Sequence, residues 1–188
     1  MTETVGLTGL WLALSADWSA QGVGLRLRQP EDFDFLRALY RSTRSAEVTA
    51  AGFDPLTAAA FLNSQFELQC RHFDAHYTLG GQRLIVLASG HPVGRVELWA
   101  TEAEGRPDLR LVDISLLREW RGRGLGTALL LAVQQAAAAD GRSVSLHVDK
   151  LNPAGRLYTR LGFRKIADTG ASWRLGWRAG KRTSARRT

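Results

Sequence analysis

Residues 121–127 form a turn rich in arginine and glycine, and its chemistry suits an anion. Glycines let a backbone approach a ligand closely and point successive N–H groups in one direction. Arg121 and Arg123 add positive charge and forked hydrogen-bond donors. Gly124 and Gly126 lead into an apolar run of helical length, and the amino end of a helix attracts negative charge. The turn therefore predicts a phosphate-binding site, and a pyrophosphate fits the description.

Two common phosphate-binding motifs do not match this turn. The dinucleotide fingerprint Gly-x-Gly-x-x-Gly needs a glycine where this chain has Thr127, and Gly126 comes one position early. The Walker pattern needs a lysine, and the turn has none. What the segment does match is Arg/Gln-x-x-Gly-x-Gly/Ala, which is filled by Arg121, Gly124 and Gly126.

A second block follows after one predicted helix and one predicted strand. Residues 146–163 read LHVDKLNPAGRLYTRLGF, with Asn152 after the strand, Tyr158 after a leucine and Phe163 after a glycine. The two blocks, in this order and at this spacing, resemble the GNAT-type N-acetyltransferases. The resemblance covers roughly residues 25–177 and is closer in the second half of the chain.

The resemblance implies a fold, a cofactor and a reaction. The fold is a single mixed α/β domain, in which a mostly antiparallel central sheet splays between two strands and is flanked by helices. The cofactor is acetyl-CoA, with no metal. The reaction is direct transfer of the acetyl group, in a ternary complex, to a primary amine of a small molecule or peptide.

The resemblance also assigns cofactor-binding residues. Free backbone groups near the end of the strand at 109–117 pair with the pantetheine arm, and the N–H of Leu116 is the expected oxyanion donor. The expected cofactor-binding residues are Ile114, Leu116, Leu117, Arg121, Gly122, Arg123, Gly124, Leu125, Gly126, Thr127 and Asn152. The adenosine 3′-phosphate has three basic candidates, Arg118, Lys150 and Arg156, among which the sequence does not choose.

Tyr158 is the expected general acid, which protonates the thiolate that leaves. The general base stays open, because some family members carry a glutamate where this chain has Arg110. The candidates are Glu97, Asp113, His147 and Glu47. Each also has a structural interpretation, such as an ion pair of Glu97 with a neighbouring arginine, and proton loss through water is a further route. Glu97 is the candidate we adopt.

Substrate residues are expected from the first two helices and the third strand. Arg44 and Glu47 lie near the expected end of the first helix, where Glu47 suits a cationic amine and Arg44 a carboxylate. Both also suit a solvated helix end with an ion pair. Trp99 suits stacking on a substrate or packing at an edge of the sheet.

Hydrophobic patterning predicts the order β-α-α-β-β-β-α-β-α-β-β, a mixed α/β arrangement with one sheet. The expected strands are 25–28, 84–88, 93–99, 109–117, 143–149, 163–167 and 172–177. The expected helices run from Pro30 to about Glu47 and over about 55–72, 124–140 and 153–161, with a polar loop at 101–108.

Charge and composition bound the remaining function classes. The 188 residues carry a net charge of +7, most of it in the last 15 residues, so the body is close to neutral. We expect an extension at 1–23, in which Trp11 and Trp18 dock on the body, a domain at 24–178 and a basic tail at 179–188. A nucleic-acid-binding protein that uses the tail, and a CoA-binding module without activity, are the alternatives.

Other classes are disfavoured. The single cysteine, Cys70, excludes a disulfide framework. The longest apolar stretch, 128–139, is shorter than the roughly 20 residues of a membrane span. The apolar run 5–16 lacks the preceding basic residues of a secretion signal. We therefore expect a cytoplasmic monomer or homodimer with no nucleic-acid or membrane partner.

Overall fold

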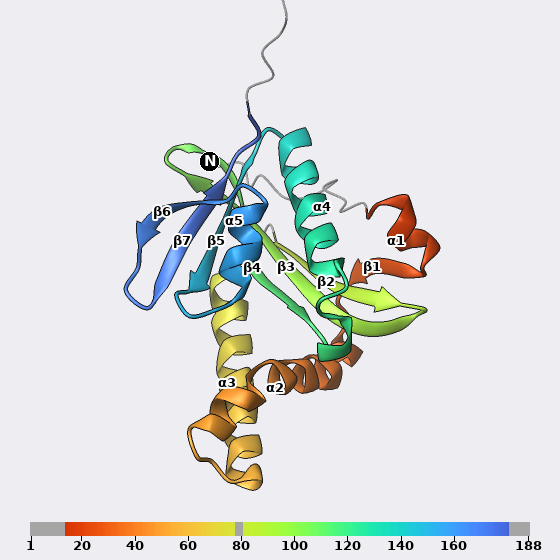
Figure 1. Ribbon diagram of the computed structural model, residues 1–188, viewed down its shortest axis with the longest axis vertical. Helices are drawn as coiled ribbons and strands as arrows, with labels where there is room; N and C mark the ends of the chain where they lie inside the picture. Colours follow the sequence, from red (N-terminus) through yellow and green to blue (C-terminus); the bar gives the residue numbers. More distant parts are fainter. Residues whose placement is uncertain (1–13, 78–80, 181–188) are drawn as a thin grey trace, which may run out of the picture.

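The structure is a computed structural model that describes residues 14–77 and 81–180. Seven strands form one sheet in the order β1-β2-β3-β4-β5-β7-β6 (Figure 1). They are β1 (Val23–Leu27), β2 (Gly81–Ala88), β3 (His91–Ala103), β4 (Arg106–Leu116), β5 (Ser143–Asp149), β6 (Arg164–Asp168) and β7 (Ser172–Trp177). The helices are α1 (Ala16–Ala20), α2 (Phe33–Ala50), α3 (Pro55–His76), α4 (Leu125–Ala139) and α5 (Ala154–Arg160).

The predicted fold class and element order are confirmed, with one further short helix, α1, before the first strand. The loop expected at 101–108 is wrong. Thr101 pairs with Asp108 and Ala103 with Arg106, so β3 and β4 continue as a hairpin whose tight turn is Glu104 and Gly105. Cross-strand hydrogen bonds hold this polar segment extended, and the hydrophobic pattern does not record them.

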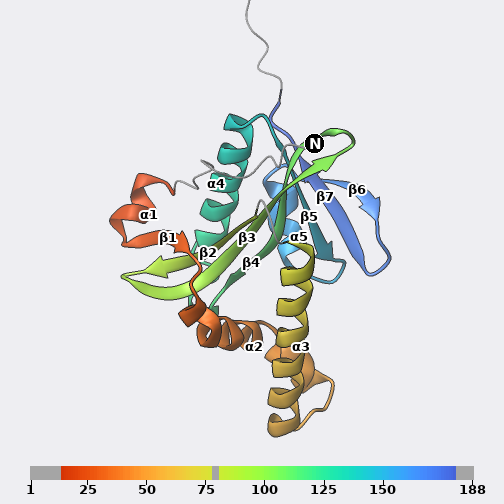
Figure 2. The ribbon, with the colours of Figure 1, turned by 180° about the vertical axis from the view of Figure 1, so that it is seen from behind.

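The helices cover the two faces of the sheet. Figures 1 and 2 show α4 and α5 on one face and α2 and α3 on the other. The larger core lies under α4 and α5, where Leu125, Leu129 and Val133 are completely buried. A smaller core lies under α2 and α3 and is centred on Phe66, which is also completely buried. The sheet is therefore a central layer between two apolar clusters.

Local sequence explains where the helices of the second face begin. Asp54 accepts hydrogen bonds from the backbone N–H groups of Leu56 and Thr57, at 3.0 and 3.1 Å, and Pro55 follows it at the first helical position. A capping aspartate followed by proline satisfies the free donors of a helix start. The cap fixes the start of α3, a 22-residue helix whose other end reaches the sheet.

The strands β4 and β5 separate along their length. They run parallel and pair only from Asp108↔Ser143 to Leu111↔Leu146, although β4 continues to Leu116 (Figure 1). A register shift in the β3–β4 pairing, with Val112 as the extra residue, occurs at the point of separation. The sheet therefore has a gap between the ends of two neighbouring strands.

Of the residues before the first strand, α1 lies against the main body. Trp18 packs against the larger core, as expected, whereas Trp11 lies outside the described residues. The part of the tail beyond 180 also lies outside them.

Candidate active site

The glycine-rich turn leads directly into α4. Gly124 is the residue before the helix and has a left-handed backbone with φ of +89°, which glycine adopts without strain. The first intrahelical hydrogen bond joins the N–H of Ala128 to the carbonyl of Gly124, at 3.0 Å. The N–H groups of Leu125, Gly126 and Thr127 therefore have no intrahelical acceptor. They point out of the helix end, where an anion is stabilised.

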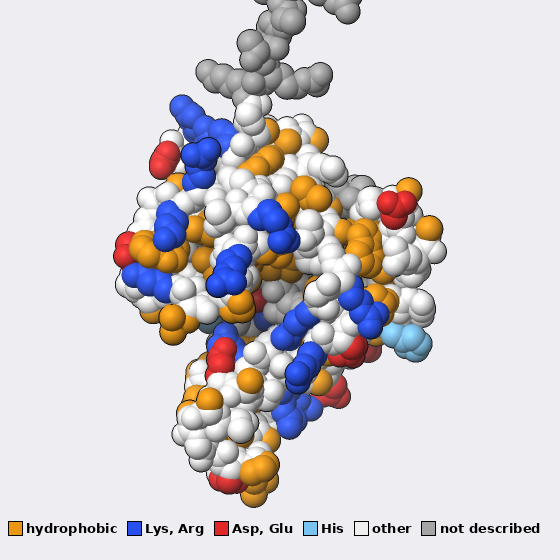
Figure 3. Space-filling model, in the orientation of Figure 1, with side chains coloured by type: hydrophobic (Ala, Val, Ile, Leu, Met, Phe, Trp, Pro, Cys, Tyr) orange, Lys and Arg blue, Asp and Glu red, His pale blue; other side chains and the backbone are white. Residues whose placement is uncertain are grey.

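Basic side chains surround this turn. Arg121 is exposed and uses its Nε to donate to the carbonyl of Leu116, at 2.8 Å. Arg123 lies over the ring of Trp120, with 5.4 Å between its guanidinium carbon and the ring centre. Figure 3 shows further Lys and Arg side chains on the same face of the molecule, around α5 and the turn. The surface beside the helix end is thus positively charged.

The end of β4 directs backbone groups into the gap. The N–H of Leu117 donates to the carbonyl of Val93 on β3, at 2.9 Å. Along an antiparallel strand, the backbone N–H and C=O groups of successive residues point to opposite sides. Ile114 and Leu116 therefore direct their N–H and C=O groups away from β3. The pairing of β5 with β4 ends at Leu111, so on that side Ile114 and Leu116 have no strand partner. A linear ligand with amide groups can pair with them.

Tyr158 lies on the buried face of α5. It is 7% exposed, and its ring lies edge-on to Phe163 with 5.8 Å between the centres. Burial, with a smaller contribution from the negative charge of Asp113, raises the pKa of Tyr158 to about 12. Tyr158 is therefore held protonated at neutral pH.

Asn152 helps to start α5, because its Oδ1 accepts a hydrogen bond from the N–H of Ala154 at 2.9 Å.

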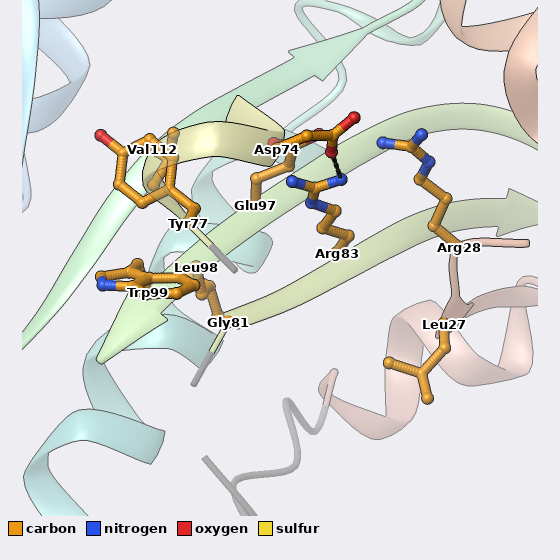
Figure 4. Close-up of a pocket in the computed structure, with 10 residues that line it drawn as sticks. All are labelled: Leu27, Arg28, Asp74, Tyr77, Gly81, Arg83, Glu97, Leu98, Trp99 and Val112. Atoms are coloured by element: carbon orange, nitrogen blue, oxygen red, sulfur yellow. Dashed lines mark hydrogen bonds and ion pairs between the residues drawn. The ribbon is translucent and has the colours of Figure 1, made fainter. Parts of the chain in front are cut away.

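A cavity of about 540 Å³ lies on the opposite face of the sheet, between α3 and strands β2 and β3 (Figure 4). Tyr77 and Trp99 stand at one end of it with their rings edge-on, 5.3 Å apart. Arg28 stands at the other end, and Arg83 donates to Asp74 between them, at 2.6 Å. The lining residues are Leu27, Arg28, Asp74, Tyr77, Gly81, Arg83, Glu97, Leu98, Trp99 and Val112.

The cavity and the gap meet at the irregularity in β4. Val112, the extra residue of the register shift, lines the cavity. The next residues that face the gap, Ile114 and Leu116, follow on the same strand. The cavity wall at Val112 is therefore only two residues along β4 from Ile114.

Glu97 lies in the cavity wall and is only 4% exposed. Its nearest cation is Arg95, at 3.5 Å, but Arg95 makes closer hydrogen bonds to Asp113, at 2.5 Å, and to Gln69, at 2.9 Å. Burial raises the pKa of Glu97, and Asp113 adds to the rise, while Arg95, Arg83 and Arg28 oppose it. The carboxylate is thus weakly held and more basic than an ordinary glutamate.

The remaining candidate bases lie elsewhere. Asp113 accepts hydrogen bonds from Arg95 and from the hydroxyl of Ser115, so its oxygens are occupied. His147 is on β5 and is hydrogen bonded to Arg110. Burial, followed by the charges of Arg110 and Arg174, lowers the pKa of His147. Among the four candidates, Glu97 alone lines the cavity.

A comparison with known families identifies the family of the chain that contains this gap and this turn. Residues 36–163 match the profile of a family described as the acetyltransferase (GNAT) family. The chain belongs to the GNAT acetyltransferases. This confirms the resemblance drawn from residues 121–127 and 146–163. Among curated proteins, none matches the chain.

Solved structures of GNAT proteins share the fold at low sequence identity. The PaiA N-acetyltransferase of Thermoplasma acidophilum, in complex with coenzyme A, has a TM-score of 0.62 and 20% identity, covering 84% of this chain and 99% of its own. An acetyltransferase of Thermus thermophilus has a TM-score of 0.57 and 22% identity, covering 83% and 96%. NAA60 of Arabidopsis thaliana, in complex with a bisubstrate analogue, has a TM-score of 0.56 and 18% identity, covering 82% and 97%.

Two of the three expected substrate residues lie away from the cavity of this GNAT domain. Arg44 and Glu47 form an ion pair of 3.9 Å on an exposed part of α2, which continues to Ala50. Trp99, by contrast, lines the cavity. Sequence reasoning did not single out Tyr77, Arg83 or Asp74, because these residues lie at the end of a helix and in a strand without a motif.

The part of the chain described by the structure contains no group of three or more His, Cys, Asp or Glu residues that could hold a metal ion. Within the same residues, no helix has the length and apolar character needed to cross a membrane.

Proposed function

We propose that this GNAT protein transfers the acetyl group of acetyl-CoA to a primary amine bound in the cavity. The observation that carries the proposal is the gap between β4 and β5, into which Ile114 and Leu116 direct N–H groups that have no strand partner. The gap begins at the cavity and ends at the glycine-rich turn. A long ligand with an anionic end and an amide-bearing arm fits such a path.

The residues at the turn suit the phosphates of the cofactor. The N–H groups at the start of α4, together with Gly122 and Arg123, would hold the pyrophosphate, and Arg121 adds charge beside it. Leu117, which directly follows β4, and Asn152, which precedes α5, are assigned to the same cofactor.

The acceptor amine would be deprotonated from the cavity side. Glu97, which lines the cavity and has a raised pKa, accepts the proton that the amine loses, directly or through water. Acetyl-CoA supplies an acetyl group activated as a thioester. The N–H of Leu116 donates to the carbonyl oxygen of that thioester as negative charge develops on it. The carbonyl of Leu116 is tied to Arg121, while Ile114 lies nearer the cavity.

Tyr158 would act on the leaving sulfur. Its raised pKa keeps the hydroxyl protonated throughout the neutral range, so that it donates a hydrogen bond, and then its proton, to the thiolate. Neither step uses a covalent enzyme intermediate, so the acetyl group passes directly from sulfur to nitrogen in a ternary complex.

The test is a free-thiol assay with acetyl-CoA and a panel of amines, amino acids and short peptides, with mass spectrometry of the products. We expect thiol release that depends on an amine, and a product heavier by one acetyl group. Initial rates over both substrates should give intersecting lines, as a ternary complex requires. Binding of acetyl-CoA with no turnover of any primary amine would favour a CoA-binding module without activity.

A further inference from the structure

Three basic side chains lie in a row across the sheet, beside the cavity. They are Arg110 on β4, His147 on β5 and Arg174 on β7, and we refer to them as the basic row. Trp99 pairs with Arg110 across β3 and β4, and His147 pairs with Arg174 across β5 and β7. Residues paired across strands share a face of the sheet. The basic row therefore lies on the same face as Trp99 and the cavity.

The members of the row contact one another. Arg110 donates to His147 Nδ1 and to the hydroxyl of Ser145, the latter at 3.3 Å. The positive charge of Arg174 is close enough to lower the pKa values of both Arg110 and His147.

No carboxylate among the described residues forms an ion pair with this row. Asp108, whose charge acts on Arg110, is completely buried, and its two oxygens accept from the hydroxyls of Ser143 and Ser145 at 2.6 and 2.5 Å. Both oxygens are therefore already engaged with neutral donors. Arg110 and Arg174 are therefore left without an ion-pair partner among the described residues, and of the carboxylates only the buried charge of Asp108 favours the charged form of Arg110. Two guanidinium groups so close together are stabilised when an anion binds.

Arg174 gives an independent indication of a missing acceptor. Its Nε is buried and has no hydrogen-bond partner among the residues that the structure describes. A buried N–H without an acceptor is rare, because leaving it unpaired costs free energy. The unpaired donor and the uncompensated charge point to the same kind of ligand.

The basic row lies beside the cavity, next to Tyr77 and Trp99, although none of its three residues lines the cavity. Tyr77, which lines the cavity, lies close enough to Arg110 for an electrostatic interaction, and the Tyr77 ring contacts Trp99. Arg110 precedes Ile114 by four residues on β4. At about 3.3 Å for each residue of a strand, four residues span about 13 Å. An anion on the basic row and an amine near Ile114 would therefore be separated by several bonds.

We propose that the basic row binds a carboxylate of the acceptor, and that the acceptor is an extended amine such as a short peptide with a free carboxyl terminus. This inference rests on the proposed function and specifies the substrate class of the same site. The aromatic pair Tyr77 and Trp99 then lies alongside the middle of the acceptor. An α-amino acid is too short to place its amine and its carboxylate at both positions.

The test compares trialanine with trialaninamide as acceptors, which differ only in the terminal carboxylate. Wild-type protein should acetylate trialanine with a kcat/KM about tenfold higher, because a charged hydrogen bond is lost in the amide. Arg174→Gln should remove that preference by raising KM for trialanine alone, with KM for acetyl-CoA unchanged. Arg174→Lys should restore part of it. Arg160→Gln, which removes an exposed charge on the other face of the sheet, is the matched control.

A binding measurement separates this proposal from the proposed function. In the presence of CoA, N-acetyl-trialanine should raise the melting temperature of the wild-type protein more than its amide does, and Arg174→Gln should abolish the difference. Equal kcat/KM for the two peptides, failure of both to react or bind, or an equal loss for both in Arg174→Gln would overturn the carboxylate site. If other amines are acetylated in that case, the proposed function stands.

Discussion

At the scale of single residues, burial raises the pKa values of two acid–base groups, Glu97 and Tyr158, with opposite consequences for their proton transfer. Burial raises the pKa of Glu97, which makes its carboxylate a stronger proton acceptor. Burial raises the pKa of Tyr158 to about 12, which makes its hydroxyl a persistent proton donor. The two groups lie on opposite faces of the sheet. Burial on each face thus favours a proton acceptor on one and a proton donor on the other.

Tyr158→Phe should separate catalysis from binding. The hydroxyl makes no hydrogen bond within the described residues, so its removal leaves the packing against Phe163 intact. We expect kcat to fall by about a hundredfold, which is the ordinary contribution of a general acid, with the affinity for acetyl-CoA unchanged. Steady-state kinetics and a binding titration check this. Equal losses in kcat and in cofactor affinity would refute the role of Tyr158 as general acid.

The raised pKa of Glu97 predicts how the rate of acetyl transfer depends on pH on the acidic side. A base must lose its proton before it accepts another, so kcat/KM for the amine should rise with pH through a pKa above the ordinary value of a glutamate. Rates measured from pH 4 to 9 check this. Glu97→Gln should lower kcat/KM and remove that rise. The exposed Glu47→Gln serves as the comparison, because Glu47 lies outside the cavity. A rise that persists in Glu97→Gln would assign it to another group.

At the scale of elements, β4 connects every part of the site. Its start carries Arg110, its irregular middle places Val112 in the cavity wall, and its end directs Ile114 and Leu116 into the gap. The turn that follows leads into α4. A change at the start of α4 should therefore affect the cofactor without disturbing the acceptor side.

Gly126→Glu should abolish binding of acetyl-CoA, because it places a negative side chain at the start of α4. The fold should tolerate a side chain here. A Cβ on Gly126 would meet its nearest neighbour, Leu157, at 3.7 Å, which is an ordinary contact. Gly126→Ala is the matched control and should retain binding. Calorimetric titration with acetyl-CoA measures both variants. Full affinity in Gly126→Glu would show that the phosphates do not bind at this helix end.

The sequence predicted the elements that carry local motifs and missed those that only tertiary contacts define. The start of α4 after the glycine-rich turn and the short helix that carries Tyr158 could be predicted, because glycines and neighbouring residues lie together in the chain. The residue types around Gly105 predict a loop, whereas the structure has a hairpin there, because strand pairing stabilises the extended backbone more than the residue types do. The cavity assembles Tyr77, Arg83 and Trp99 from three elements, and no local pattern relates them.

At the scale of the whole molecule, the two faces of the sheet have unequal cores. The core under α4 and α5 is large, whereas the one under α2 and α3 depends on few residues. Phe66 is completely buried there, with the rings of Phe33 and Tyr40 at 5.3 and 5.7 Å. Tyr77, which lines the cavity, is the residue directly after α3. The packing of this helix on the sheet therefore also shapes the cavity.

Phe66→Ala should lower the free energy of unfolding by about 3–5 kcal/mol, the usual cost of removing a completely buried phenylalanine. Denaturant unfolding monitored by tryptophan fluorescence measures it. Leu56→Ala, at a side chain on the same helix that is 82% exposed, should change stability by about 0.5 kcal/mol or less. Similar values for the two variants would mean that α3 does not depend on the smaller core.

The most direct test of the cofactor site is a titration of the folded wild-type protein with acetyl-CoA. The melting temperature is measured at each concentration, and CoA is titrated in parallel. A ligand that binds only the folded state stabilises it in proportion to the logarithm of its concentration once the site is saturated. We predict that the melting temperature rises in this way with both compounds. No change in the melting temperature at millimolar acetyl-CoA, in a sample shown to be folded, would contradict the assignment of the gap and the turn to the cofactor.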